Sequence, residues 1–117
     1  MSKIKIYHNP RCSKSRNGVK VLESAKVDFE VVKYLEEIPS KKELKEIIKM
    51  LGISPIQLIR KGEKIWKENY KGKELSDDEI ITAMIENPKL IERPIVIKEN
   101  KAVIGRPSEN IEELLKN

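Results

Sequence analysis

The stretch that decides the fold covers residues 3–34 and reads KIKIYHNPRCSKSRNGVKVLESAKVDFEVVKY. Alternating apolar residues predict a strand over 3–7 and a second strand over 29–34. Apolar residues between them recur at helical spacing, which predicts a helix beginning near Ser13. A parallel strand pair joined by a helix has a right-handed crossover, and its ligand site lies beyond the carboxyl ends of the strands. The loop over 8–12 occupies that position.

Cys12 lies in this loop, directly before the predicted helix, and is the one cysteine of the chain. The free N–H groups of a helix N-terminus and the positive end of its dipole stabilise an anion. His8, Arg11, Lys14 and Arg16 add positive charge or hydrogen-bond donors nearby. A lone cysteine is most often a small buried apolar residue without chemistry, but Cys12 has no apolar neighbour for several residues on either side. We therefore expect a reactive thiol with a lowered pKa.

Length and composition indicate one domain over residues 1–117. Apolar residues make up 38% of the chain and charged residues 37%, which is typical of a globular protein with a strongly hydrated surface. No apolar run approaches the roughly 20 residues that span a bilayer, and the N-terminus does not resemble a signal peptide, so a cytoplasmic location and no membrane partner are expected. A single cysteine cannot form an internal disulfide. We expect a monomer.

Several classes of ligand are not expected. The net charge is +5, but basic and acidic residues alternate without a block of like charges, so no nucleic-acid partner is predicted. One histidine and one cysteine do not make an ordinary zinc site, and no metal is expected. The glycine signatures of nucleotide-binding loops are absent from the sequence.

The middle of the chain is predicted to be helical. Two capping boxes, formed by Ser40 with Glu43 and by Ser76 with Glu79, each precede an apolar stripe at helical spacing. Gly52 is the expected C-terminal residue of the first of these helices. These stripes are predicted to form core.

The end of the chain returns to strands. Residues 95–97 and 102–104 predict a β-hairpin, and an amphipathic helix follows. A short helix after Ser54 is expected to end at Arg60. The resulting order predicts an α/β, thioredoxin-like fold: a four-stranded mixed sheet with a helical insertion between strands 2 and 3, at about residues 40–88.

Only five of the 24 basic residues are arginine, and three of these stand at the ends of predicted elements. Arg93 and Arg106 lie at strand ends and each precedes a proline, which restricts the arginine backbone to extended conformations. Arg60 ends the short helix. Each arginine taken singly is more often a solvated surface residue. The planar guanidinium, however, can bind an oxyanion through two parallel hydrogen bonds, whereas lysine supplies a point charge.

Four motifs resemble one known family in their order and spacing. They are HNPRCSKSRN at 8–17, LIRK at 58–61, ERPIV at 92–96 and GRPSE at 105–109. Together they resemble the glutaredoxin-coupled, glutathione-dependent arsenate reductases of the thioredoxin-like superfamily, and the likeness covers nearly the whole chain.

The resemblance implies a catalytic thiol at Cys12 that attacks arsenate. It implies that three arginines hold the oxyanion, namely Arg60, Arg93 and Arg106, and that the Arg93–Pro94 peptide bond is cis near the thiol. Glutathione as co-substrate and glutaredoxin as partner are expected, with no bound cofactor. Supporting roles are expected for His8, Ser15, Arg16 and Pro94.

Ser15 occupies the position of the second cysteine of dithiol relatives, so an external thiol is required. Its hydroxyl is expected either to donate a hydrogen bond to Cys12 or to cap the helix. His8 is expected either to support the thiolate or to act as a structural hydrogen-bonding group. The phosphatase-like arsenate reductases need an arginine six positions after the cysteine, where this chain has Gly18.

Two alternative functions stay open on the sequence. One is a glutathione-dependent thiol oxidoreductase that does not act on arsenate; such relatives typically lack the arginine that matches Arg106. The other is a redox regulator of the same fold that binds RNA polymerase, although such regulators usually carry a Cys-x-x-Cys switch, which Ser15 removes.

Overall fold

A computed structural model describes residues 4–116, and the chain divides into two compact units. One unit consists of the chain up to Glu37 together with the chain from Arg93 onward, and the other is Ile38–Glu92. The second unit corresponds closely to the insertion predicted at about 40–88. A single domain over 1–117 stays a prediction.

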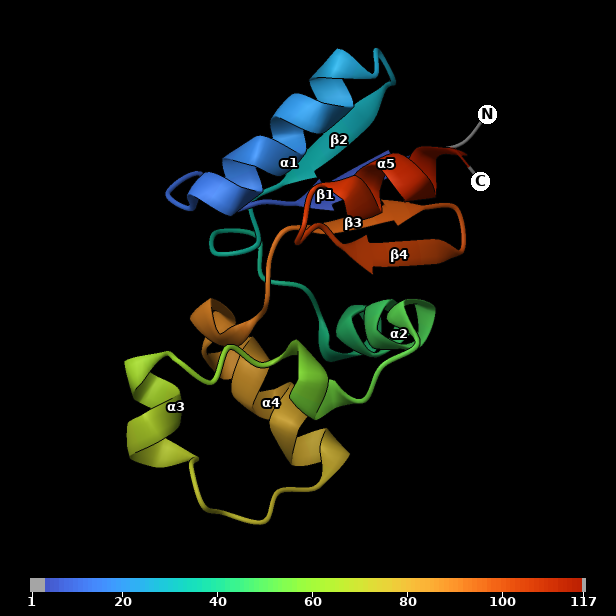
Figure 1. Cartoon of the computed structure of the whole chain (residues 1–117). Coiled ribbons are helices and arrows are strands. Elements are labelled where there is room, and N and C mark those ends of the chain that lie inside the picture. Colours follow the sequence, from blue (N-terminus) through green and yellow to red (C-terminus); the bar gives the residue numbers. More distant parts are fainter. Residues whose placement is uncertain (1–3, 117) are drawn as a thin grey trace. The chain divides into compact units, whose positions relative to one another are not determined.

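The first unit is built on a four-stranded mixed sheet of order β2-β1-β3-β4 (Figure 1). Strand β1 pairs in parallel with β2 and antiparallel with β3, and β3 pairs antiparallel with β4. This arrangement confirms the predicted thioredoxin-like α/β fold. The elements are β1 (Ile4–Tyr7), α1 (Ser13–Ser24), β2 (Phe29–Val32), β3 (Ile95–Lys98), β4 (Lys101–Ile104) and α5 (Glu109–Lys116).

Helices α1 and α5 pack against the same face of this sheet. One apolar cluster joins residues of β1, β3 and both helices: Ile4, Ile6, Leu22, Val96, Ile111 and Leu114. Burying each of these side chains contributes about 1.5–3 kcal/mol. The cluster holds α1 and α5 on one framework with the sheet.

Most predicted boundaries of the first unit are confirmed, and α1 begins at Ser13 as expected. Strand β2 ends at Val32 rather than at Tyr34, because the Lys33 carbonyl accepts hydrogen bonds from the N–H groups of Glu36 and Glu37 and forms a turn. The predicted first strand began at Lys3, which lies outside the described residues.

The second unit contains only helical elements among the residues that the structure describes. They are α2 (Lys41–Leu51), η1 (Pro55–Leu58), α3 (Lys64–Asn69), α4 (Asp77–Glu86) and η2 (Pro88–Leu90). Both capping boxes are confirmed, and Gly52 ends α2 with a positive φ of 70°. The short helix after Ser54 is a 3₁₀ turn that ends at Leu58 rather than at Arg60.

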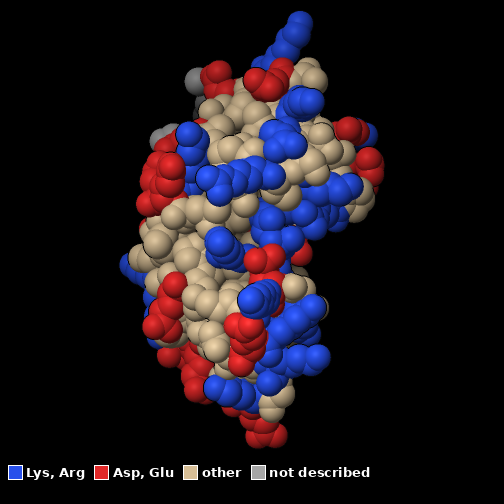
Figure 2. Space-filling model, turned by 90° about the vertical axis from the view of Figure 1, so that its left-hand side faces the viewer, with Lys and Arg blue, Asp and Glu red and all other residues tan. Residues whose placement is uncertain are grey.

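Within residues 4–116, no helix has the length and apolar character needed to cross a membrane. Basic and acidic side chains are interspersed over the face of the molecule shown in Figure 2. This mixture agrees with the alternation of charge along the sequence.

Candidate active site

The loop between β1 and α1 holds Cys12 at the first position before the helix. His8 extends the parallel pairing by donating its N–H to the Val32 carbonyl at 2.9 Å. The Cys12 N–H then closes a turn on the Asn9 carbonyl at 3.0 Å, and the Cys12 carbonyl accepts the first helical bond, from the N–H of Arg16, at 3.0 Å. Cys12 is therefore the N-cap residue, with extended backbone and a partly exposed side chain.

Two of the three predicted arginines contact the thiol from the other end of the chain. The Nη2 atom of Arg106 lies 3.5 Å from Cys12 Sγ. The Arg93 guanidinium also acts on the thiol through hydrogen bonding and charge, and Arg93 is only 9% exposed. The Arg93–Pro94 bond is cis, as the family resemblance implied, and the Arg106–Pro107 bond is cis as well, which was not predicted.

These contacts give Cys12 a pKa of about 7, below the usual value of 9.0. Partial burial alone raises the pKa, because it disfavours the charged thiolate. The backbone N–H of Ser15, the hydrogen bonds from Arg93 and Arg106, and the charge of Arg93 together outweigh burial. The Ser15 N–H acts here without forming a capping hydrogen bond to the side chain. About half of the thiol is thus ionised at neutral pH.

Pro94 ties to the core the two segments that carry Arg93 and Arg106. Its side chain is fully buried, and its carbonyl accepts the N–H of Gly105 at 2.8 Å. A Cβ atom at Gly105 would lie 2.9 Å from Pro94 Cγ and 2.8 Å from Ile111 Cδ1, and a Cβ at Gly18 would lie 3.0 Å from the same Pro94 atom. The two glycines therefore leave the space that the proline ring fills. Sequence reasoning missed both, since their neighbours come from distant segments.

The Ser15 side chain forms hydrogen bonds within the loop that carries Cys12. Its side chain is completely buried, and its Oγ lies 2.7 Å from His8 Nδ1. The same Oγ accepts the N–H of Asn9 at 2.9 Å. The hydroxyl is therefore engaged within the loop, and the His8 tautomer sets which group donates in its bond with Nδ1. The Asn9 side chain in turn accepts the N–H of Arg11 at 3.0 Å, a turn that the Asn-Pro dipeptide signals in the sequence.

His8 contributes hydrogen bonding rather than charge. Its burial, helped by the charges of Lys33 and Arg16, lowers its pKa below the usual 6.5, against a raising contribution from Ser15. The ring is therefore mainly neutral at pH 7. This favours the structural interpretation of His8 over that of a cation beside the thiolate.

The basic residues next to Cys12 in sequence are exposed. The Arg16 guanidinium donates to the Pro10 carbonyl at 2.9 Å in an exposed position. Arg11 and Lys14 are exposed. The distant Arg93 and Arg106, not these neighbours, supply the main cationic contacts of the sulfur.

Arg60 belongs to the second unit and is held by two carboxylates there. Its Nη1 atom lies 3.0 Å from Glu63 Oε2, and its Nε lies 3.7 Å from Glu92 Oε1. Its N–H donates to the Leu90 carbonyl at 2.7 Å, and the Glu92 N–H donates to the Leu58 carbonyl at 2.9 Å. The Arg60 segment is thus paired with the residue that directly precedes Arg93 in the chain.

The geometry combines a nucleophile with donors for an anion. A half-ionised thiol at a helix N-terminus can attack an electrophilic centre, and two guanidinium groups can hold the oxygens attached to that centre. On a thioredoxin-like sheet, this combination defines a protein with a thiol site suited to oxyanions.

Comparison with known proteins agrees with this class. The model of the ArsC family matches residues 7–114, so the chain belongs to the ArsC family. It is 44% identical to a protein named arsenate reductase from Neisseria meningitidis, over 98% of this chain and 100% of the relative. It is 46% identical to the uncharacterised protein YfgD of Escherichia coli, over 96% of each chain. The solved structure of arsenate reductase from Vibrio cholerae superposes with a TM-score of 0.90 at 45% identity, covering 95% of this chain and 96% of the other.

Proposed function

We propose that this protein is an arsenate reductase, an oxidoreductase in which Cys12 is the nucleophile. The observation that carries the proposal is the contact between Cys12 Sγ and Arg106 Nη2 at 3.5 Å, with the pKa of Cys12 lowered to about 7. Arsenate carries one to two negative charges at neutral pH, and the attacking thiolate is also an anion. Cations at the site offset the repulsion between the two.

The first step forms a sulfur–arsenic bond. The Cys12 thiolate attacks arsenic(V), and one arsenate oxygen takes up protons and leaves as water. Arg93 and Arg106 hold the remaining oxygens and stabilise the charge that develops on them. Arsenic is not yet reduced in this step.

The second step transfers two electrons. The glutathione thiolate attacks the Cys12 sulfur of the adduct, so that a sulfur–sulfur bond forms as the sulfur–arsenic bond breaks. The electron pair of the broken bond stays on arsenic, which leaves as arsenite in the +3 state. Glutaredoxin then removes glutathione and restores the Cys12 thiol. An external donor is needed because the chain has one cysteine, and Ser15 stands where dithiol relatives have a second. Reduced glutathione places this chemistry in the cytoplasm. The chain acts as a monomer without a bound cofactor.

Arg60 is the third arginine that we propose for oxyanion binding. The hydrogen bond between Leu58 and Glu92 supports this role, since it ties the segment before Arg60 to the residue before Arg93. To bind arsenate, the Arg60 guanidinium has to exchange its pairing with Glu63 and Glu92 for the oxyanion. An Arg60→Lys variant keeps the charge but loses the planar fork, so we expect a higher KM for arsenate.

The first test is arsenite formation by Cys12→Ser with glutathione and glutaredoxin supplied. We expect complete loss of turnover, while Arg16→Ala, whose guanidinium bonds the Pro10 carbonyl, keeps most of it. Retained turnover in Cys12→Ser would refute the assignment of the nucleophile.

The second test separates this proposal from the two alternatives. Alkylation of Cys12 is followed by mass spectrometry during titration with arsenate or with equal phosphate. A reductase is protected by arsenate, through the covalent adduct, far more than by phosphate. Equal protection by both anions, or none, would favour a thiol oxidoreductase or a regulator that does not use arsenate.

A further inference from the structure

The second unit contains a pocket that the proposed chemistry does not use. Its volume is about 580 Å³, within the range of small ligand sites, and every residue that lines it belongs to Ile38–Glu92. Its apolar part comes from η1, α3, α4 and the loop before α4, and consists of Ile56, Trp66, Tyr70, Leu75 and Ile80. Neither Cys12 nor its two arginines line it.

The aromatic side of the pocket is held in place. The rings of Trp66 and Tyr70 stack with centroids 5.5 Å apart, and the Tyr70 hydroxyl accepts the Asn87 side-chain amide at 3.1 Å. The loop after α3 is also fixed, because the Lys71 N–H donates to the Trp66 carbonyl at 2.9 Å. Gly72 follows with a positive φ of 82°. A partner that binds here meets a surface that is already formed, which lowers the ordering cost of association.

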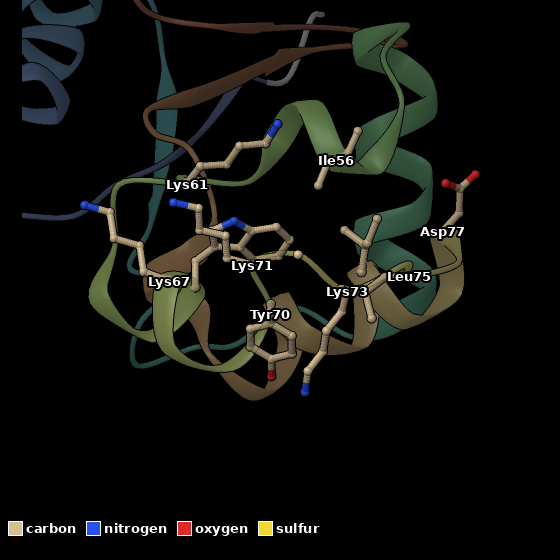
Figure 3. Close-up of a pocket in the computed structure, with 11 residues that line it drawn as sticks. Ile56, Lys61, Lys67, Tyr70, Lys71, Lys73, Leu75 and Asp77 are labelled. Carbon is tan, nitrogen blue, oxygen red and sulfur yellow. The ribbon is translucent and has the colours of Figure 1, made fainter.

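The charged part of the pocket is mostly basic. Four of the lining residues are lysines, one is an aspartate, and all five are exposed: Lys61, Lys67, Lys71, Lys73 and Asp77. Figure 3 shows Lys61, Lys67 and Lys71 on one side of the pocket, while Asp77 lies at the opposite side with its carboxylate directed outward. The apolar floor is thus bordered by ammonium groups on one side.

We propose that this pocket docks an acidic segment of a partner protein. One apolar side chain of the segment packs on the floor beside Trp66, and flanking carboxylates pair with Lys61, Lys67 and Lys71. The charge complementarity favours a polypeptide over a small organic anion. Small-molecule sites use a few rigidly placed polar groups, whereas long exposed lysines act as mobile point charges that suit carboxylates spaced along a chain.

Trp66 allows a direct test, since it is the one tryptophan of the protein. The probe is a short synthetic peptide with one leucine flanked by glutamates and without aromatic residues. We expect a saturable change of Trp66 fluorescence at low salt that weakens as salt is added, because exposed charge pairs are screened. The same peptide with glutamine in place of glutamate should bind at least about fivefold more weakly.

Charge reversal in the pocket is compared with the same charge change elsewhere in the unit. We expect Lys67→Glu with Lys71→Glu to weaken the peptide at least about fivefold. The matched control is Lys42→Glu with Lys89→Glu, two exposed lysines that do not line the pocket, and it should bind normally. Circular dichroism of both double variants verifies the fold.

The proposal would be overturned by the absence of a saturable signal, by equal loss in both double variants, or by equal binding of the glutamine peptide. Tight binding of butyrate or succinate, as tight as that of the peptide, would instead identify a small-molecule site and would also overturn it. The peptide is expected to bind Cys12→Ser as well as the wild type. Failure of the arsenate chemistry therefore leaves this test unaffected.

Discussion

At the residue scale, the acidity of Cys12 depends on cations that reach it from the other end of the chain. The thiolate fraction follows a pKa of about 7, so the rate of alkylation by neutral iodoacetamide should rise with a midpoint near pH 7 rather than near 9. Arg106→Ala removes the guanidinium 3.5 Å from the sulfur and moves the midpoint upward. At pH 7 we expect alkylation about two- to fivefold slower.

The control for this prediction is Arg16→Ala. Arg16 is closer to Cys12 in sequence, but its guanidinium bonds the Pro10 carbonyl, so the midpoint should hardly move. A larger shift in Arg16→Ala than in Arg106→Ala would contradict the assignment of the cations that act on the thiol.

Ser15 is expected to matter for stability rather than for acidity. Ser15→Ala leaves His8 Nδ1 and the Asn9 N–H without their shared partner in a buried place, so the free energy of unfolding should fall by about 1–3 kcal/mol. The backbone N–H of Ser15, which lowers the pKa of Cys12, is unchanged. Urea denaturation should therefore show the loss while the alkylation midpoint stays near pH 7.

Ser24→Ala is the matched control, since Ser24 is exposed on the same helix. It should be close to neutral in urea denaturation. If Ser15→Ala were equally neutral, the bracing role of its hydroxyl would be wrong.

The residues that the structure brings together at this site carry clearer signals in the sequence than the links between them. Cys12 stood out by its polar neighbours, and Arg93 and Arg106 by the prolines that follow them. The hydrogen bond between His8 and Ser15 depends on the conformation of the loop, and the spacing of seven residues between them does not predict it. Placement of Arg60 beside the thiol stays a prediction.

At the element scale, the close packing of Gly105 against α5 and Pro94 can be tested by one substitution. Gly105→Ala would place a Cβ atom 2.8 Å from Ile111 Cδ1 and 2.9 Å from Pro94 Cγ, so the neighbours must move. We expect a loss of about 1–3 kcal/mol in the free energy of unfolding and slower alkylation of Cys12, because Pro94 adjoins Arg93.

Gly62→Ala makes the same substitution where nothing lies within 4 Å of the new atom and φ is not positive. It should be neutral, or stabilising by a few tenths of a kcal/mol, as expected when alanine replaces glycine without a clash. Equal effects in both variants would contradict the close packing at Gly105.

Elements with local signals were predictable, and those that depend on packing were not. The capping boxes at Ser40 and Ser76 predicted α2 and α4 because a cap is a contact between near neighbours. Helix α3 has six residues and no side-chain cap, so it has no local signal for its boundaries, and it is held by the burial of Trp66. The predicted end of the short helix at Arg60 was wrong, because Arg60 instead pairs its backbone with Leu90.

At the scale of the whole molecule, two groups make stability depend on pH in opposite parts of the range. Cys12 has a folded pKa of about 7 against 9.0 unfolded, so the unfolded chain holds the proton longer and stability should rise between pH 7 and 9. The pKa of His8 is lowered below 6.5, so the unfolded chain takes up a proton first as the pH falls, and stability should drop below pH 6.5.

The midpoint of urea denaturation, measured across this pH range, checks the rise above pH 7 and the drop below pH 6.5. Cys12→Ser should abolish the rise above pH 7 and keep the drop below pH 6.5. A rise that persisted in Cys12→Ser would show that another group causes it.

The packing around Pro94 links the reactivity of the Cys12 thiol to the packing of the C-terminal helix α5. Ile111 of α5 and Pro94 both lie close to Gly105. Arg93 precedes Pro94 and Arg106 follows Gly105, and both arginines lower the pKa of Cys12. Loosening of α5 from this packing would also loosen the segment of Arg106, which directly precedes the helix, and would raise the pKa of Cys12. When α5 loosens on warming, labelling of Cys12 by a thiol-reactive dye should therefore slow relative to that of a free thiol at the same temperature.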